Sequence, residues 1–466
     1  MIRFINRVNE LALLESEWRK DRASFIVLYG RRRIGKTRLI LEFIKDKKGI
    51  FYIAEDTNTK TQIEEVKKTF SRFFEDSFLE RVELKEWGDF FEYLEKLVPR
   101  NEKLFIVIDE FSYLIRSDRT ILSVLQKFWD TFLTNTKVFL LVSGSLLGLM
   151  SEQVLSSASP LYGRRTRDIL LEEMRFESIR EFLDKMGFEE QLKTSMVTGG
   201  VPEYLLRARE YDNFEEFVHH EFLRKDGYFY REPYFLLSQE FKEIKTYFAI
   251  LNAVAYGNTR PTEIANFAGI KGREVYPYLE NLIRLGFIER LTPIGEPRKG
   301  IYLIRTPLLD FWFNFVYKNR ENIEMGIATL KDAGSLAAYF GKRFETLIRE
   351  DIFHKLFKFQ KVGKWWHKEE EVDLVALDES RGEILFAECK WQDHINAEEI
   401  LEKLRNKSSS IKWHTENRKE QYAVFAKSFK KRVEEKNTYC YDISDLEKFY
   451  EKHLQTPETP RKKKSK

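Results

Sequence analysis

The sequence has 466 residues, of which 43% are hydrophobic and 33% are charged. A chain of this length exceeds what one hydrophobic core usually serves, so we expect three or four domains. The formal net charge of +4 is small for this size and does not by itself indicate a nucleic-acid-binding protein. Any basic binding surface must therefore be local.

The cysteines and the apolar runs indicate the cellular compartment in which the protein is expected. Cys389 and Cys440 lie far apart and lack metal-type spacing, which favours a reduced intracellular protein. The first residues, MIRFINRVNELALLE, contain no long apolar run, so we expect no signal peptide. No apolar run approaches the ~20 residues of a membrane helix. The sequence thus predicts a soluble cytoplasmic protein that makes no membrane contact.

The N-terminal third alternates short apolar runs with helical patterns. A short lead and a helix occupy residues 1–20. Strands are expected at 24–29, 49–54, 103–108 and 138–142, with 169–171 a candidate for one more, and helices at 36–47, 61–78, 87–97 and 120–133. Strands that alternate with helices predict right-handed βαβ units, and hence an α/β fold built on a parallel sheet.

The pattern then changes character. Residues 175–257 are helical apart from a break at 198–202. Helices at 241–256, 261–267 and 272–285, followed by strand-like runs at 287–291 and 300–305, have the order of a winged helix. A last domain has a helix at 341–358 and strands at 371–376 and 384–389. We therefore expect an ATPase core (1–174), a helical lid (175–238), a winged helix (239–325), an α/β domain (335–455) and a basic disordered tail (456–466).

Residues 30–37, GRRRIGKT, match the complete phosphate-binding loop pattern between a strand and a helix. Glycines let backbone N–H groups turn toward phosphates, and the helix that follows adds the positive end of its dipole. Lys36 should reach the β- and γ-phosphates of ATP, and Thr37 should bind Mg²⁺. The expected nucleotide-binding residues of the loop are Gly30, Arg31, Arg32, Arg33, Ile34, Gly35, Lys36, Thr37 and Arg38.

Two further strands end in polar residues. Asp109 and Glu110 follow one of them, where a carboxylate holds the Mg²⁺ shell and a second one polarises the attacking water. Ser143 and Ser145 close the next strand, and one of them could sense the γ-phosphate. The alternatives are a helix N-cap for the acids and ordinary turn chemistry for the serines.

Several segments together resemble the archaeal ATPase family of the STAND/AAA+-related P-loop class: FINRVNEL, YGRRRIGKT, IVIDEF, VSGS, SPLYGRRT and TGGVPEYL. The resemblance implies that the lead segment, with Phe4 and Arg7, packs near adenine, and that Gly200 and Pro202 of the helical lid contact the base. It also implies that Arg164 or Arg165 acts on the γ-phosphate, in some relatives from a neighbouring subunit of a homo-oligomer. A surface arginine pair and a simple helix break are the alternatives.

The winged-helix segment carries residues suited to DNA. Its third helix and wing present basic, aromatic and amide side chains: Lys271, Arg273, Tyr276, Tyr278, Asn281, Arg284, Arg290, Arg298 and Lys299. Val275, Leu279, Leu282 and Ile283 are the expected buried face. Acidic residues dilute the charge, and such domains also bind proteins, so both kinds of partner stay open.

A third group of residues lies near the C-terminus. Asp373 is followed fifteen residues later by Glu388 and Lys390, which share a face of a strand because the side-chain period is two. This set resembles the metal-and-lysine site of PD-(D/E)XK nucleases, although no proline precedes Asp373. The resemblance adds Glu345 as a helical ligand beside Asp373 and Glu388, with Mg²⁺ bound and Lys390 assisting hydrolysis. Solvated charges, or an inactive relative of the nucleases, are the alternatives.

Two functions follow from these observations. In the first, ATP hydrolysis drives a DNA-engaging C-terminal half with metal-dependent cleavage. In the second, the protein is an ATP-driven regulatory switch or scaffold that binds protein partners, and its nuclease-like domain is inactive. DNA-stimulated ATPase activity and salt-sensitive DNA affinity distinguish the first function from the second.

Overall fold

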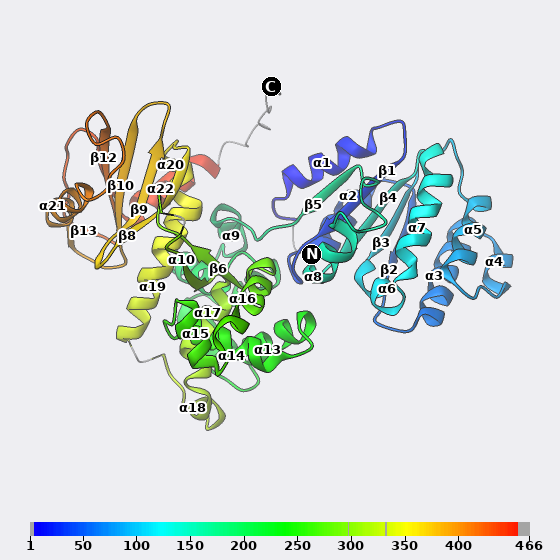
Figure 1. The fold of residues 1–466 in the computed structure, drawn as a ribbon, viewed down its shortest axis with the longest axis horizontal. Coiled ribbons are helices and arrows are strands. Elements are labelled where there is room, and N and C mark those ends of the chain that lie inside the picture. Colours follow the sequence, from blue (N-terminus) through cyan, green and yellow to red (C-terminus); the bar gives the residue numbers. More distant parts are fainter. Residues whose placement is uncertain (1–3, 297, 331–332, 455–466) are drawn as a thin grey trace. The chain divides into compact units, whose positions relative to one another are not determined.

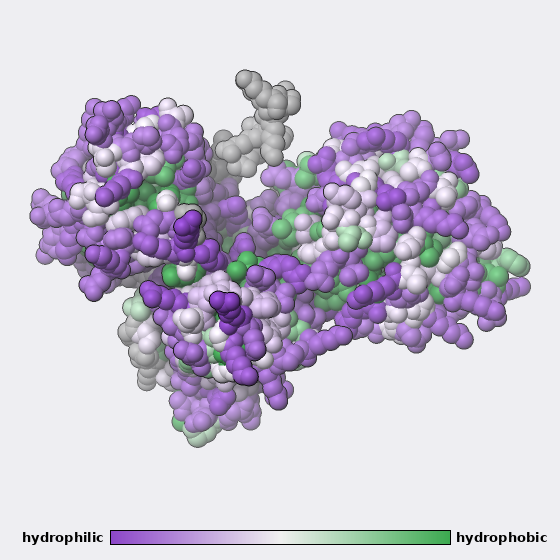
Figure 2. All heavy atoms as spheres, in the orientation of Figure 1, coloured by the Kyte–Doolittle hydropathy of each residue, from purple (hydrophilic) through white to green (hydrophobic). Residues whose placement is uncertain are grey.

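The structure is a computed structural model that describes residues 4–296, 298–330 and 333–454. It consists of two compact units, Met1–Glu173 and Met174–Lys466 (Figure 1). The predicted basic tail at 456–466 lies outside the described residues. Figure 2 shows polar and charged residues over most of the visible surface of each unit. No helix in the described ranges has the length and apolar character needed to cross a membrane.

The first unit is built on a five-stranded parallel sheet with the strand order β2-β3-β4-β1-β5. The strands are β1 (Ser24–Tyr29), β2 (Gly49–Ile53), β3 (Phe105–Asp109), β4 (Phe139–Gly144) and β5 (Arg167–Leu170). The helices are α1 (Val8–Trp18), α2 (Lys36–Ile44), α3 (Thr59–Phe74), α4 (Ser77–Arg81), α5 (Trp87–Leu97), α6 (Phe111–Ser117), α7 (Thr120–Thr131), α8 (Leu147–Leu149), the short 3-10 helix η1 (Leu133–Asn135) and the π-helix η2 (Met150–Leu155).

Alternate residues of the strands supply two cores, one on each face of this sheet. In β1, Phe25 and Val27 pack with α3, α5, α6 and α7, whereas Ile26 and Leu28 pack with α1 and α2. A strand that is covered on both faces reads as a continuous apolar run, which is why SFIVLY marked β1 so clearly. The predicted parallel α/β fold is confirmed for this unit, and the sheet presents the carboxyl ends of its strands along one edge.

The second unit begins with helices α9 (Phe176–Phe182), α10 (Phe188–Thr198), α11 (Pro202–Ala208), α12 (Phe214–Glu221) and α13 (Tyr228–Glu240). It continues with α14 (Ile244–Ala255), α15 (Pro261–Ala268), η3 (Gly272–Glu274), α16 (Val275–Arg284) and the antiparallel pair β6 (Ile288–Leu291) and β7 (Ile301–Ile304). Helices α17 (Pro307–Phe311), η4 (Trp312–Tyr317) and α18 (Arg320–Glu324) follow.

A second five-stranded sheet, with the order β14-β12-β10-β9-β8, forms the C-terminal part of this unit. Its strands are β8 (Lys361–His367), β9 (Glu370–Asp378), β10 (Glu383–Lys390), β12 (Lys419–Ala426) and β14 (Thr438–Tyr441), and a small pair is formed by β11 (Ile395–Asn396) and β13 (Phe429–Lys431). The helices here are α19 (Ala333–Leu347), η5 (Ile348–Ile352), α20 (Phe353–Leu356), α21 (Ala397–Ser408) and α22 (Ile443–Leu454). Strands β8, β9 and β10 pair antiparallel with one another, whereas β10, β12 and β14 pair in parallel.

Candidate functional sites

The loop between β1 and α2 forms a cradle at the carboxyl edge of the first sheet. Gly35 has φ 92°, a left-handed conformation that favours glycine, and it precedes the first turn of α2. At Gly30 a Cβ atom would lie 2.6 Å from the Leu171 carbonyl oxygen, so only glycine fits there. Lys36 is buried, and its Nζ donates hydrogen bonds of 3.0 Å to the carbonyl oxygens of Gly30 and Arg31. The ammonium group is therefore held on the loop itself.

Asp109 joins the loop to the neighbouring strand ends. Thr37 Oγ1 donates to Asp109 Oδ2 at 2.6 Å, and Ser143 Oγ donates to Asp109 Oδ1. Since Asp109 ends β3 and Ser143 lies in β4, the carboxyl ends of adjacent strands bring these side chains together. Hydroxyl and carboxylate oxygens are the ligands that Mg²⁺ prefers, so this set fits the expected ion.

Glu110 stands beside this group with an unusual backbone. Its φ of 54° and ψ of 38° are left-handed, which costs a non-glycine residue about 1–2 kcal/mol. Its Oε2 accepts a hydrogen bond of 2.7 Å from Ser145 Oγ. Strained backbone conformations cluster at active sites, and the Ser145 hydroxyl group orients the Glu110 carboxylate. Glu110 is therefore a candidate functional residue.

The arginines of the loop lie in different surroundings. Arg31 Nη1 lies 3.7 Å from Glu173 Oε1, and Arg32 donates to the Tyr113 hydroxyl. Arg33 has a left-handed φ of 66°. Ile34 is buried in the core on the α2 face, and Arg38 is exposed on the first turn of α2. The loop thus takes its shape from both its glycines and the side chains around it.

The lead segment is tied to the loop through Arg7. Arg7 Nη2 donates to the carbonyl oxygens of Ile34 at 3.2 Å and Glu172 at 2.7 Å, while Nη1 pairs with Glu10 at 3.1 Å. Burial lowers the pKa of Arg7 and outweighs the effect of Glu10. Phe4 packs partly buried against the core that α1 and α2 cover. Arg7 therefore stabilises the loop through its hydrogen bond to the Ile34 carbonyl oxygen.

The predicted arginine pair is engaged elsewhere in the first unit. Arg164 Nε and Nη2 bind Asp130 of α7 at 2.9–3.1 Å. Arg165 Nη1 donates to the carbonyl oxygens of Val154 and Leu155 at 3.2 Å. The contacts shown for these two guanidinium groups are thus with a carboxylate and with backbone carbonyl oxygens of the first unit.

In the second unit, the Gly-Gly-Val-Pro segment is a helix junction. Gly199 ends α10 with φ 65° and ψ −161°, and Pro202 is in the first turn of α11. The Gly200 carbonyl oxygen accepts a 2.8 Å hydrogen bond from Met174 N. A Cβ atom at Gly200 would lie 1.9 Å from the Met174 carbonyl oxygen, so the backbones approach too closely for any other residue.

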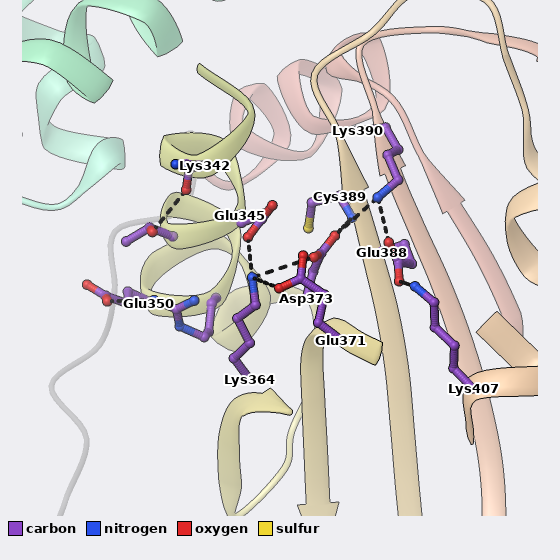
Figure 3. A network of polar contacts seen from close by, with 12 residues as sticks. Lys342, Glu345, Glu350, Lys364, Glu371, Asp373, Glu388, Cys389, Lys390 and Lys407 are labelled. Atoms are coloured by element: carbon purple, nitrogen blue, oxygen red, sulfur yellow. Dashed lines mark hydrogen bonds and ion pairs between the residues drawn. The ribbon is translucent and has the colours of Figure 1, made fainter. Parts of the chain in front are cut away.

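Three of the predicted C-terminal residues, Asp373, Glu388 and Lys390, lie in contact with one another (Figure 3). Lys390 Nζ lies 2.5 Å from Glu388 Oε2 and 3.4 Å from Asp373 Oδ2. The Cys389 N–H also donates to Asp373 Oδ2 at 2.9 Å. Glu345 enters from α19, which packs against β10, and is linked to Asp373 through a common lysine partner. One helix and two strands thus contribute to one connected group.

Two lysines that sequence reasoning missed complete this group. Lys364 Nζ contacts Glu345 Oε2 at 3.0 Å, Glu371 Oε2 at 3.2 Å and Asp373 Oδ1 at 3.9 Å. Lys407 Nζ of α21 contacts Glu388 Oε1 at 2.8 Å. A signal existed for Lys364, which is a charged residue within the aromatic strand KVGKWWH. We call Glu345, Lys364, Glu371, Asp373, Glu388, Lys390 and Lys407 the carboxylate–lysine cluster.

Burial and mutual charge shift the pKa values of this cluster. Burial, followed by the charge of Asp373, raises the pKa of Glu345 to about 7 and raises that of Glu388. Burial acts to lower the pKa of Lys364, but its carboxylate partners outweigh it and the pKa lies above the usual value. The same balance raises the pKa of Lys390. Both lysines are therefore ammonium groups at neutral pH.

The expected metal set is not preassembled. Among the residues that the structure describes, no three or more His, Cys, Asp or Glu side chains are grouped so as to hold a metal ion. That Glu345, Asp373 and Glu388 hold Mg²⁺ stays a prediction, because their oxygens are not grouped in this way in the structure. The physical reason is that the Lys364 and Lys390 ammonium groups are bound to these carboxylates.

The helix–helix–helix–hairpin segment follows the predicted order, with one difference in burial. Val275, Leu279 and Leu282 are buried, but Ile283 is 36% exposed, so its expected burial is wrong. Asn281 Nδ2 donates to the Tyr247 hydroxyl at 2.9 Å. The loop between β6 and β7 lies against β8, where the Ile294 N–H donates to the Lys364 carbonyl oxygen at 2.9 Å.

The first sheet and its loop define a P-loop nucleotide-binding protein, and comparison with known proteins gives the family. A family described as an ATPase domain predominantly from Archaea matches residues 4–207, and one described as "Archaea bacterial proteins of unknown function" matches residues 312–403. The uncharacterized protein MJECL04 of Methanocaldococcus jannaschii is 34% identical over 462 residues, which are 96% of this chain and 100% of that protein. The chain belongs to this family of archaeal P-loop ATPases, so ATP binding and hydrolysis are assigned to it.

Two further similarities agree with this assignment. The uncharacterized ATP-binding protein MJ0423 of the same organism is 50% identical over 48 residues, which are 10% of this chain and 81% of that protein. The Walker-type ATPase PABY2304 of Pyrococcus abyssi has a similar structure, with a TM-score of 0.52 and 20% identity over 66% of this chain and 96% of its own. The structural similarity shows the fold alone, and the predicted archaeal P-loop ATPase is confirmed by the family assignment.

Proposed function

We propose that this ATPase uses ATP hydrolysis to drive a DNA-engaging second unit, in which the carboxylate–lysine cluster cleaves phosphodiester bonds with a divalent metal ion. The observation that carries the proposal is the convergence of Glu345, Asp373, Glu388 and Lys390 on one group of contacts. Chance charges on strand ends would be solvated and scattered, whereas Asp373 and Glu388 are almost fully buried.

At the cradle, Lys36 would hold the β- and γ-phosphates, while Thr37 and Asp109 would hold Mg²⁺, which neutralises phosphate charge when bound. Glu110 would orient the attacking water, and Ser143 would report the γ-phosphate through its bond to Asp109. The hydrogen bonds that already join Thr37, Asp109 and Ser143 support these roles. The backbone N–H groups of the loop would supply the remaining donors.

The more distant roles are part of the same proposal. Phe4 and Arg7 would border the adenine, and Gly200 and Pro202 would border it from the lid. Arg164 or Arg165 would act on the γ-phosphate, either of its own chain or of a neighbouring subunit. For Arg164 that role requires exchanging Asp130, which is partly exposed, for a phosphate, and such surface ion pairs exchange at little cost.

DNA would meet the segment from α14 to β7, which we propose is a winged helix. Lys271 and Arg273 are exposed just before and within the short helix η3, and Tyr276, the second residue of α16, is 44% exposed. Phosphate contacts from the basic residues would give affinity that falls with salt concentration. The aromatic side chain would add contact to a base or sugar.

The chemistry of the cluster fits this substrate. Carboxylate oxygens suit Mg²⁺ or Mn²⁺, and a bound ion supplies charge neutralisation and a water of lowered pKa at the scissile phosphate. Lys390, on the exposed side of the cluster, would stabilise the negative charge that grows on the phosphate oxygens. The Cys389 N–H holds Asp373 in place during this step.

The test is cleavage of plasmid and forked DNA by the full-length protein with Mg²⁺ or Mn²⁺, with and without ATP. Asp373→Ala should abolish cleavage and leave ATP hydrolysis intact. Asp393→Ala, which removes an exposed carboxylate that pairs with Lys427 in the same part of the fold, is the matched control and should cleave normally. Absence of cleavage in all conditions, with ATPase activity indifferent to DNA, contradicts the proposal.

A second function is favoured by one observation. The carboxylates of the cluster are bound to lysines, as expected of a nuclease-like domain that has become a scaffold. The protein would then be an ATP-driven switch whose exposed surfaces bind protein partners. It predicts no stimulation of the ATPase by DNA and no salt-sensitive DNA affinity, so the same assays separate the two functions.

A further inference from the structure

Lys364 lies where a cation would bind between the helix α19 and the strand β9. Its ammonium group contacts Glu345 from α19 at 3.0 Å and Asp373 from β9 at 3.9 Å, and it reaches Glu371 on the rim at 3.2 Å (Figure 3). The Lys364 side chain is 15% exposed, so water screens these contacts only weakly. Carboxylates from two separate elements therefore share one buried positive charge.

The three lysines of the cluster do not do the same thing. Lys390 and Lys407 both contact Glu388, on the β10 side. Lys364 is the one of the three whose contacts include Glu345. Removing Lys364 would thus leave Glu345 and Asp373 facing each other without the charge between them, while the contacts of Glu388 would persist.

The backbone fixes Lys364 in this position. Its carbonyl oxygen accepts the Ile294 N–H at 2.9 Å, and Ile294 packs beside Gly363, where a Cβ atom would be 3.6 Å away. On its other side, strand β8 pairs antiparallel with β9, and the register shifts between Gly363 and Trp365, so Lys364 lies at an irregularity of the pairing. The Ile294 contact holds the backbone of Lys364, so rotation of its own side chain is the simplest way for the ammonium group to leave the carboxylates.

We propose that Lys364 is the resident cation of the carboxylate–lysine cluster, which a divalent metal ion must displace in order to bind Glu345 and Asp373. This inference rests on the proposed metal-dependent function. A metal ion and an ammonium group cannot share the same oxygens, because like charges at such distances repel strongly in a buried site. Lys364 therefore sets the affinity for the metal.

The test is Mn²⁺ binding to the full-length, nucleotide-free protein, measured by titration calorimetry and by the electron paramagnetic resonance of free Mn²⁺. Lys364→Met removes the charge but keeps a long apolar side chain, and it should lower the Kd at least tenfold. Lys364→Arg keeps the charge and should not tighten binding. Lys361→Met, on the same strand but exposed, is the matched control and should behave as wild type.

A measurement on the wild-type protein keeps the inference testable if Lys364→Met does not fold. Displacement by Mn²⁺ should increase acylation of Lys364 by an amine-reactive reagent, mapped by mass spectrometry, and leave that of Lys361 unchanged. One outcome is that the wild-type protein binds Mn²⁺ and loses this binding in Asp373→Ala. If Lys364→Met then leaves the Kd unchanged and Mn²⁺ leaves the labelling of Lys364 unchanged, the inference is wrong and the proposed function stands. If no variant shows Mn²⁺ binding that depends on Asp373, the proposed metal-dependent function itself fails.

Discussion

Replacement of Glu110 by glutamine tests the catalytic assignment of the first unit. The side chain keeps its shape, and its amide oxygen can still accept the hydrogen bond that Ser145 Oγ donates at 2.7 Å. The left-handed backbone is unchanged, because φ at this position does not depend on the charge. The substitution therefore removes little except the negative charge that would orient and polarise the attacking water.

The structure allows both magnitudes to be worked out. Loss of a general base typically slows a reaction by about 10²–10⁴-fold, which corresponds to roughly 3–5 kcal/mol in the barrier. The cost in folding stability should stay below about 1 kcal/mol, since the hydrogen bond survives and the residue is only partly buried. We thus expect a large loss of turnover with almost no change in thermal stability or ATP affinity.

The assay is phosphate release at saturating ATP, combined with binding of a fluorescent nucleotide and thermal melting. Glu110→Gly and Glu110→Ala form a useful pair, because both lose the carboxylate but only glycine relieves the positive φ. Glu110→Gly should therefore be the more stable of the two by about 1 kcal/mol. Turnover of Glu110→Gln within twofold of wild type would refute the assignment and require another residue to position the water.

Three further predictions follow from single contacts. Lys36→Ala should abolish hydrolysis and weaken ATP binding more than tenfold in an equilibrium titration, and unchanged turnover would remove the central claim. Gly200→Ala should lower the melting temperature strongly, since its Cβ would meet the Met174 carbonyl oxygen at 1.9 Å, whereas Gly341→Ala, in open space within α19, should stabilise by roughly 1 kcal/mol. Burial raises the pKa of Asp351, so wild-type stability should fall as pH rises through that pKa, and Asp351→Asn should remove this fall in melting curves recorded across pH. A parallel pH dependence in both proteins would contradict the last of these.

Elements specified by local pattern were predicted well from the sequence. Strand β1 was expected over Ser24–Tyr29 and is found there. A short apolar run that ends at a glycine loop is typical of a strand buried on both faces. Helix α5 was likewise expected over Trp87–Leu97, where its apolar spacing is regular. The phosphate cradle depends on the same kind of short-range information.

Predictions that depend on long-range packing were less complete. Helix α19 begins at Ala333 and not at Gly341, because packing outweighs the weak helix propensity of one glycine. Ile283 continues an apolar spacing but is exposed on α16. Lys364 was missed because its partners come from other elements. The pairing of β8 with β9 brings in Asp373, and the helix α19, which packs against β10, brings in Glu345.

The two proposed sites are governed by lysines in opposite ways. At the cradle, Lys36 donates to two carbonyl oxygens, and an incoming phosphate attracts this ammonium group away from them. The contacts given up are worth about 1.5–3 kcal/mol each, and charge-assisted bonds to the phosphate replace them. At the cluster, the incoming ligand is a cation, so it repels Lys364 and competes for the same carboxylates. Loss of the lysine charge should therefore weaken nucleotide binding at the first site and strengthen metal binding at the second. If Lys36→Ala weakened nucleotide binding and Lys364→Met also weakened metal binding, Lys364 would be a residue that supports the metal site and not the cation that occupies it.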